Sequence, residues 1–123
     1  MERPLVGRSI LVAEDEPLIA IDIRRGFEAA GARVVNVRSL QSALVAVEDA
    51  DLSAAIVDPA LGKDDCSQLC ERLKERDIPF VVHSGYSNLA GAYSSGVVVS
   101  KPRQSEVLVT TVVGLLRSRP IAH

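Results

Sequence analysis

A chain of 123 residues is long enough for one domain with a single apolar core and too short for two such domains. An apolar fraction of 47% argues against disorder, and 14 basic against 16 acidic residues argue against a nucleic-acid partner. No apolar run approaches the ~18 residues of a membrane helix, residues 1–8 contain no secretory signal, and two cysteines favour reduced thiols in the cytoplasm.

Short runs rich in valine and isoleucine recur along the chain and are typical of strands buried on both faces of a parallel sheet. These predicted strands are Ser9–Ala13, Arg33–Val37, Ala54–Val57, Phe80–His83 and Val97–Ser100.

Amphipathic stretches between these runs predict helices. The first begins at Pro17 and stops at Gly31, and Ser39 caps a second that runs to about Asp49. The others are a helix capped by Asp64 or Asp65 that runs to about Arg76, and a last helix over Gln104–Arg117. The segment Ser87–Gly96 is short and rich in glycine and serine, which predicts a loop or a single helical turn.

Alternation of strand and helix predicts an α/β fold of the (βα)5 flavodoxin-like type. We expect one domain over residues 1–123, with a doubly wound parallel sheet in the order 2-1-3-4-5 and a shortened or degraded fourth helix. Ligands of such folds bind at the carboxyl ends of the strands.

Polar side chains follow four of the five predicted strands directly. Glu14 and Asp15 follow the first, Asp58 the third, Ser84 the fourth and Lys101 the fifth. Each one alone is typical of a turn, a helix cap or a solvated surface. Together at one edge of a sheet, they indicate phosphoryl transfer to a carboxylate. Clustered carboxylates repel one another and favour a hard cation such as Mg²⁺.

In this interpretation Asp58 is the nucleophile and forms an acyl phosphate. Lys101 supplies a positive charge for the phosphoryl oxygens, and Ser84 supplies a hydroxyl donor. Pro59 removes one backbone donor, which leaves the N–H groups of Ala60 and Gly85 available to the phosphoryl oxygens.

The sequence around these residues resembles the receiver domain of two-component response regulators over nearly the whole chain. The matching segments are residues 10–17, 56–58, 61–62, 84–86 and 101–102. The resemblance implies that Asp58 accepts a phosphoryl group from a phosphohistidine of a histidine kinase or phosphotransferase. It further implies that Asp15, Asp58 and the Ala60 carbonyl bind Mg²⁺, that Glu14 acts through water, and that the Lys101–Pro102 peptide is cis.

A narrower resemblance covers residues 79–86, which are similar to the Pro-Phe-x-Phe-Ala-Thr-Gly-Tyr stretch of the FAT GUY receivers. Many members of that subclass are single-domain regulators with a shortened fourth helix. The match is imperfect because His83 replaces a small residue and Ser84 replaces threonine.

Ordinary receivers carry an aromatic residue three positions before the lysine, where this chain has Val98. The familiar inward swing of that aromatic cannot operate here, so Ser84 and Tyr86 are the switch candidates. Tyr86 packed over the fourth crossover is an equally good interpretation. Arg103 replaces the usual apolar residue after Lys101-Pro102 and is expected to be solvated.

Three further residues are better explained by packing than by chemistry. His83 is expected to face a helix layer as a core histidine. Cys66 and Cys70 lie four positions apart without a nearby histidine, which makes a poor zinc site and favours packing.

Because the chain ends at His123 after the last helix, we expect no effector domain, with output through protein contact or as a phosphate sink. Leu18 and Ile21 widen the apolar face of the first helix, the region that the family presents to its kinase. The last helix is apolar from Val107 to Leu116, and its candidate residues for a partner or homodimer contact are Val109, Val113 and Leu116. The alternative is that the apolar face of this helix is buried in the core of its own domain.

Two rival functions follow from the same residues. The chain could be a pseudo-receiver that binds protein partners without phosphorylation, an alternative that Val98 and Ser84 leave open. It could also be a small Mg²⁺-dependent phosphatase, but Ala60 offers no general acid near Asp58.

Overall fold

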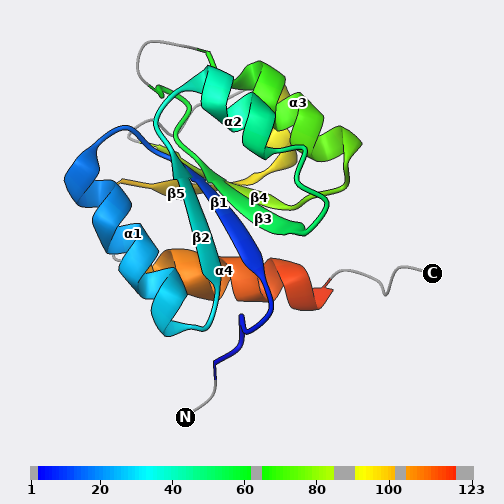
Figure 1. The fold of residues 1–123 in the computed structure, drawn as a ribbon. Helices are drawn as coiled ribbons and strands as arrows, with labels where there is room; N and C mark the ends of the chain where they lie inside the picture. The colour runs from blue at the N-terminus through cyan, green and yellow to red at the C-terminus, as the bar shows by residue number, and fades with distance from the viewer. Residues whose placement is uncertain (1–2, 62–64, 85–90, 102–104, 119–123) are drawn as a thin grey trace.

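The computed structural model describes residues 3–61, 65–84, 91–101 and 105–118 and shows a five-stranded parallel sheet with helices on both faces (Figure 1). The strands are β1 (Ser9–Ala13), β2 (Arg33–Val37), β3 (Leu52–Val57), β4 (Phe80–Ser84) and β5 (Val97–Ser100). The helices are α1 (Pro17–Ala29), α2 (Leu40–Ala46), α3 (Ser67–Glu75) and α4 (Ser105–Ser118), with a 3₁₀ helix η1 (Gly91–Ser95).

The sheet order is β2-β1-β3-β4-β5, which confirms the predicted flavodoxin-like topology. The registers of β1 with its two neighbours align the strand ends, because Ala13 of β1 pairs with both Val37 of β2 and Val57 of β3. The residues that follow β1 and β3 are therefore brought to the same edge of the sheet.

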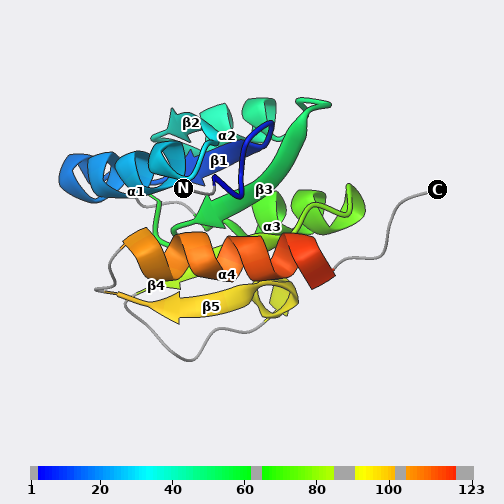
Figure 2. The same cartoon turned by 90° about the horizontal axis from the view of Figure 1, so that it is seen from below.

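Each face of the sheet has its own apolar layer. Side chains alternate along β1, so Ile10 and Val12 pack with α1 and α4, whereas Leu11 and Ala13 pack with α2 and α3. Figure 2 shows α4 lying against the side of the sheet that carries β4 and β5. Burial on both faces explains why the central strands β1, β3 and β4 read as continuous apolar runs, whereas the edge strands β2 and β5 are partly exposed.

The helix limits differ from prediction by a few residues. The Ser39 side chain accepts from the Ser42 N–H at 3.1 Å, which confirms the predicted cap, but α2 ends at Ala46 rather than near Asp49. The Arg76 guanidinium donates to the carbonyls of Val47 and Asp49 just beyond that end. A side chain that follows α3 thus satisfies carbonyls that a longer helix would have used.

The connection from β4 to β5 contains no long helix in its described part. Only η1 is present there, which agrees with the predicted single helical turn. Residues 85–90 lie outside the described residues, as do the predicted cap Asp64 and the predicted first residue of the last helix, Gln104.

Gly26 marks a close approach of α1 to α4. A Cβ atom at this position would lie 2.5 Å from Ser105 Oγ and 2.6 Å from Ser105 Cβ. Because serine is too short to move aside, we expect Gly26→Ala to lower the free energy of unfolding by about 1–3 kcal/mol in urea denaturation.

Gly114→Ala is the matched control, since nothing lies within 4 Å of the added Cβ on α4. We expect it to raise stability by about 0.5–1 kcal/mol through helix propensity. Equal midpoints for the two variants would show that α1 and α4 are not held at this distance.

Candidate functional site

Three carboxylates gather at the carboxyl edge of the sheet. One oxygen from each of Glu14, Asp15 and Asp58 lies within 4.8 Å of the other two. Glu14 is only 2% exposed and Asp58 only 8% exposed, whereas Asp15 is partly exposed. The sequence prediction that these acids share one site is therefore matched by their positions.

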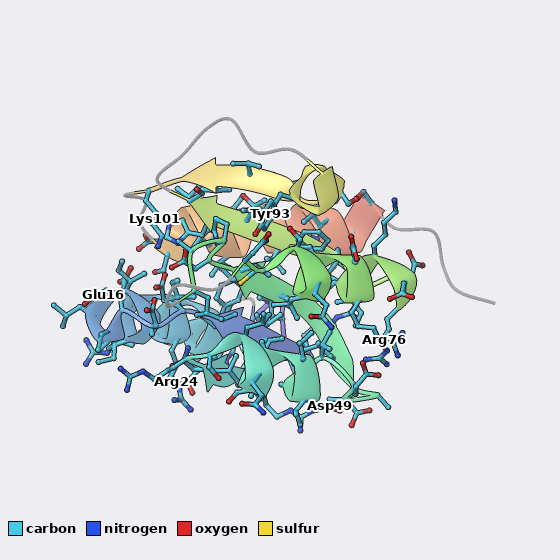
Figure 3. All side chains as sticks on the ribbon, turned by 90° about the horizontal axis from the view of Figure 1, so that it is seen from above. Glu16, Arg24, Asp49, Arg76, Tyr93 and Lys101 are labelled. Atoms are coloured by element: carbon cyan, nitrogen blue, oxygen red, sulfur yellow. The ribbon has the colours of Figure 1, made fainter. Side chains whose placement is uncertain are left out.

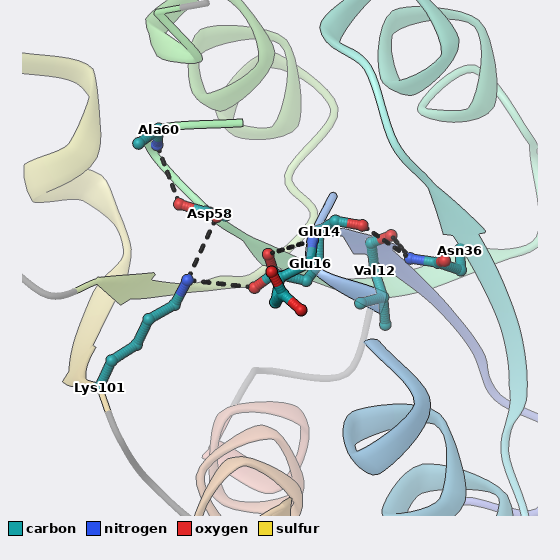
Figure 4. A network of polar contacts seen from close by, with 7 residues as sticks. All are labelled: Val12, Glu14, Glu16, Asn36, Asp58, Ala60 and Lys101. Atoms are coloured by element: carbon teal, nitrogen blue, oxygen red, sulfur yellow. Dashed lines mark hydrogen bonds and ion pairs between the residues drawn. The ribbon is translucent and has the colours of Figure 1, made fainter. Parts of the chain in front are cut away.

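The backbone of the sheet fixes two of these acids. The Glu14 N–H donates to the Val37 carbonyl and the Asp58 N–H donates to the Ala13 carbonyl, both at 3.0 Å. Asn36 adds a side-chain bond from Nδ2 to the Val12 carbonyl at 2.9 Å (Figure 4). Sequence reasoning did not single out Asn36, whose polar side chain interrupts an apolar strand.

Lys101 joins two of the acids. Its Nζ lies 3.1 Å from Glu14 Oε1 and 3.2 Å from Asp58 Oδ2 (Figure 4). Burial alone would lower the pKa of Lys101, but the charges of Glu14 and Asp58 outweigh it and raise that pKa. Lys101 therefore stays protonated and acts as the counter-ion of the buried acids.

Lys101 is itself held in place from β4. Its backbone N–H donates to the Ser84 carbonyl at 2.7 Å, so the last residue of β4 positions the residue that follows β5.

The surroundings of Glu14 disfavour its charged form, and its pKa is raised. Burial raises the pKa of Glu14, and the Asp58 charge adds to this, although the Glu16 N–H and Lys101 both lower it. The Glu16 N–H donates to Glu14 Oε2 at 3.1 Å. Two buried acids that share one lysine, when both are ionised, leave a net negative charge at the site. Hard oxygen donors with surplus negative charge fit Mg²⁺ well.

The backbone after Asp58 differs from expectation in one respect. The Ala60 N–H, which we expected to be available, donates to Asp58 Oδ1 at 2.9 Å. The reason is local, because the carboxylate folds back over its own turn in an Asx-type bond. This donor is thus aimed at the group that would carry the phosphoryl oxygens.

Ser84 is the last residue of β4, one residue beyond the predicted strand, and is 1% exposed. The other predicted contacts of this region, Gly85 and Tyr86, lie outside the described residues, and so do Gly62, Pro102 and Arg103. Val98, which stands in the place of the usual aromatic, is 38% exposed on β5.

Tyr93 is a residue of this region that sequence reasoning missed. It lies in η1, and its hydroxyl contacts Asp65 and Cys66, which precede α3. The only available signal was an aromatic residue in a segment otherwise rich in glycine and serine.

His83 is buried at 3% exposure, as predicted for a core histidine. Strand alternation places it on the same face as Val81, which packs with α1 and α4. Neither of its ring nitrogens has a hydrogen-bond partner among the described residues. Burial, followed by the charge of Lys101, lowers the pKa of His83 to about 4.

This depressed pKa predicts acid sensitivity. Between about pH 6.5 and pH 4 the unfolded chain binds a proton at His83 that the folded chain does not bind, so stability falls as the pH falls. At ~1.4 kcal/mol per unit, the loss is up to about 3 kcal/mol. We expect the wild type to lose this much more stability than His83→Val between pH 7 and pH 4 in urea denaturation. Parallel pH profiles would contradict a neutral, buried His83.

Both cysteines are packing residues, as predicted. Cys66 and Cys70 are fully buried in the apolar layer beneath α2 and α3. Burial raises the pKa of the Cys70 thiol to about 12, which leaves it unreactive at neutral pH.

The predicted partner surfaces differ in exposure. Leu18 is 77% and Ile21 46% exposed on α1, and Ile21 also lines a pocket beside Glu14 with Arg24 and Arg38. On α4, the candidate residues Val109, Val113 and Leu116 are partly buried against the chain's own core. Much of the apolar face of α4 is therefore used within the domain.

None of the helices in the described part of the chain combines the length and apolarity needed to cross a bilayer.

Comparison with known proteins identifies similar chains. A family model for the response regulator receiver domain matches residues 10–113. No curated protein sequence matched the chain.

Solved structures agree with the family model. A response regulator receiver protein from Sinorhizobium medicae WSM419 is 26% identical with a TM-score of 0.82, over 93% of this chain and 98% of that one. SdrG from Sphingomonas melonis Fr1 is 32% identical with a TM-score of 0.75, over 94% and 99%. The receiver domain of a Pseudomonas aeruginosa PAO1 sensor histidine kinase, with Mg²⁺ in its active-site cleft, is 20% identical with a TM-score of 0.79, over 92% and 100%.

Proposed function

Because this chain belongs to the response regulator receiver domain family, we propose that Asp58 accepts a phosphoryl group from a phosphohistidine of a histidine kinase or phosphotransferase. One observation carries the proposal, namely the Asp58 carboxylate at the sheet edge with Lys101 Nζ 3.2 Å away and two further acids beside it. Membership of the family makes the domain a signalling phosphoacceptor rather than a metabolic enzyme.

The transfer forms one bond and breaks one. An Asp58 oxygen bonds to phosphorus, and the bond from phosphorus to the donor imidazole nitrogen breaks. The electron pair stays on that nitrogen, so the donor histidine leaves as a neutral or solvent-protonated imidazole. The product is an acyl phosphate on Asp58.

The residues around Asp58 have distinct roles in this proposal. Lys101 and the Ser84 hydroxyl contact the phosphoryl oxygens, and the N–H groups of Ala60 and Gly85 complete the cradle. In the structure the Ala60 N–H binds Asp58 Oδ1, so a phosphoryl oxygen has to take over that donor.

We propose Mg²⁺ as the cofactor, held by Asp15, Asp58 and the Ala60 carbonyl, with Glu14 acting through water. The support is the cluster of acid oxygens and the metal named for the Pseudomonas receiver domain. What bound Mg²⁺ supplies is positive charge that offsets the carboxylates and the phosphoryl oxygens.

We further propose that the phosphodonor docks on α1 beside the site. Leu18 and Ile21 are exposed apolar side chains there, and an exposed apolar pair next to a reactive edge is suited to a protein partner.

Intact-mass spectrometry after incubation with acetyl phosphate and Mg²⁺ tests the function. We expect one phosphoryl adduct per chain with Mg²⁺ and none with excess EDTA. Phosphoramidate, whose P–N bond mimics phosphohistidine, serves as a second small donor. Absence of an adduct with both donors would contradict the proposal and favour a receiver-like module that binds partners without phosphate.

A further inference from the structure

Tyr93 joins two segments that flank the phosphorylation site. Its ring is half-buried in the apolar layer of α2 and α3, and it lies between η1 and α3 (Figure 3). Its hydroxyl accepts from the Cys66 N–H at 2.9 Å and donates to Asp65 Oδ1 at 2.7 Å. The Pro59 carbonyl lies 3.5 Å from the same hydroxyl oxygen.

These partners lie in the loop between Asp58 and α3, of which the structure describes residues 59–61 and 65–66. Pro59 follows the phosphoacceptor, and Asp65 and Cys66 end the loop where α3 begins. Asp65 Oδ1 also accepts from the Ser67 N–H at 2.9 Å, so Tyr93 contacts the side chain that binds the first N–H of α3, although the N-cap position itself is Cys66. Burial, with Asp65, raises the pKa of Tyr93 to about 12, so the hydroxyl keeps its proton at neutral pH.

The segment that carries Tyr93 is also connected to the proposed site. Tyr93 lies in the connection between β4, which ends at Ser84, and β5, which leads to Lys101. One hydroxyl therefore links the loop after Asp58 to the segment between the two other phosphoryl-binding residues. Val98 cannot make such a link, because valine carries no polar group.

We propose that Tyr93 is a positioning residue that holds the loop after Asp58 in its phosphate-accepting arrangement and couples that loop to η1. The inference rests on the proposed function, since its signal is the phosphoryl group on Asp58. That group has to take the Ala60 N–H from Asp58 Oδ1, which disturbs the loop two residues after Asp58. Because the Tyr93 hydroxyl binds Asp65 and Cys66 at the end of this loop, a change in the loop alters the position of Tyr93 and of η1.

Tyr93→Phe tests the proposal because it removes the hydroxyl and keeps the ring. Intact-mass time courses with acetyl phosphate and Mg²⁺ give the phosphorylation rate, and amide NMR shifts of Gly91 and Ser95 report on η1. We expect phosphorylation of Tyr93→Phe to be roughly threefold to tenfold slower, the effect of one lost hydrogen bond. We also expect the η1 shifts that phosphorylation induces in the wild type to be lost in the variant.

Controls separate the outcomes. Asp65→Asn weakens the same contact from the other side and is the second variant if Tyr93→Phe does not fold. Wild-type rates and η1 shifts in folded Tyr93→Phe, or loss of the shifts in Tyr86→Phe instead, would overturn the coupling. Absence of an adduct on the wild type would overturn the proposed function and the coupling with it.

Discussion

Asp58→Asn should abolish the phosphoryl adduct while the protein keeps its fold. A carboxamide has the shape of a carboxylate, but it lacks the negatively charged oxygen that attacks phosphorus. We therefore expect at least a ~100-fold loss of phosphorylation. Lys101 retains Glu14 at 3.1 Å, so the variant leaves no unpaired buried cation. Intact mass after acetyl phosphate and Mg²⁺ measures the adduct, and circular dichroism measures the fold.

The matched control is Asp51→Asn, which changes an exposed aspartate just before β3, at the opposite end of the strand that leads to Asp58. We expect it to be phosphorylated like the wild type. An Asp58→Asn protein that is still labelled at the wild-type rate would show that another residue is the acceptor.

Lys101→Met should have the second largest effect, on both stability and phosphorylation. It leaves the buried Glu14 and Asp58 without their shared cation. Breaking a buried ion pair from one side is costly, so we expect the free energy of unfolding in EDTA to fall by about 2–4 kcal/mol. Phosphorylation should fall by at least ~100-fold because the charge opposite the phosphoryl oxygens is lost.

Magnesium distinguishes this effect from a general loss of packing. A cation bound by the acids replaces part of the missing charge, so adding Mg²⁺ should stabilise Lys101→Met more than the wild type in thermal unfolding. Lys74→Met is the control, since Lys74 is an exposed lysine on α3. Equal stabilisation of all three proteins by Mg²⁺ would contradict the role of Lys101 as the counter-ion.

The sheet and the neighbourhood of its acids were predictable because both depend on local patterns. Strands buried on two faces read as apolar runs, and parallel strands bring their carboxyl ends to one edge. The places of Glu14, Asp58 and Lys101 follow from these two rules, since each residue comes directly after such a run. Alternation of the elements predicted a parallel sheet, and the order 2-1-3-4-5 was taken from the flavodoxin-like fold type.

Other features depend on contacts between distant residues and were not predictable. The end of α2 depends on Arg76, which is 27 residues from Asp49 in sequence. The hydrogen bond of the Tyr93 hydroxyl depends on Asp65, 28 residues away. The engaged Ala60 N–H depends on the rotamer of Asp58, which sequence does not specify.

The contact between Lys101 and Glu14 spans 87 residues of sequence, from the end of the first strand to just past the last. A nascent chain that has not yet added its final strand thus contains the acids of the site without the lysine that pairs with them. Closing so long a loop is among the slow steps of folding. The lysine on which the proposed phosphoryl transfer depends is therefore the last of the site's charged residues to be synthesised.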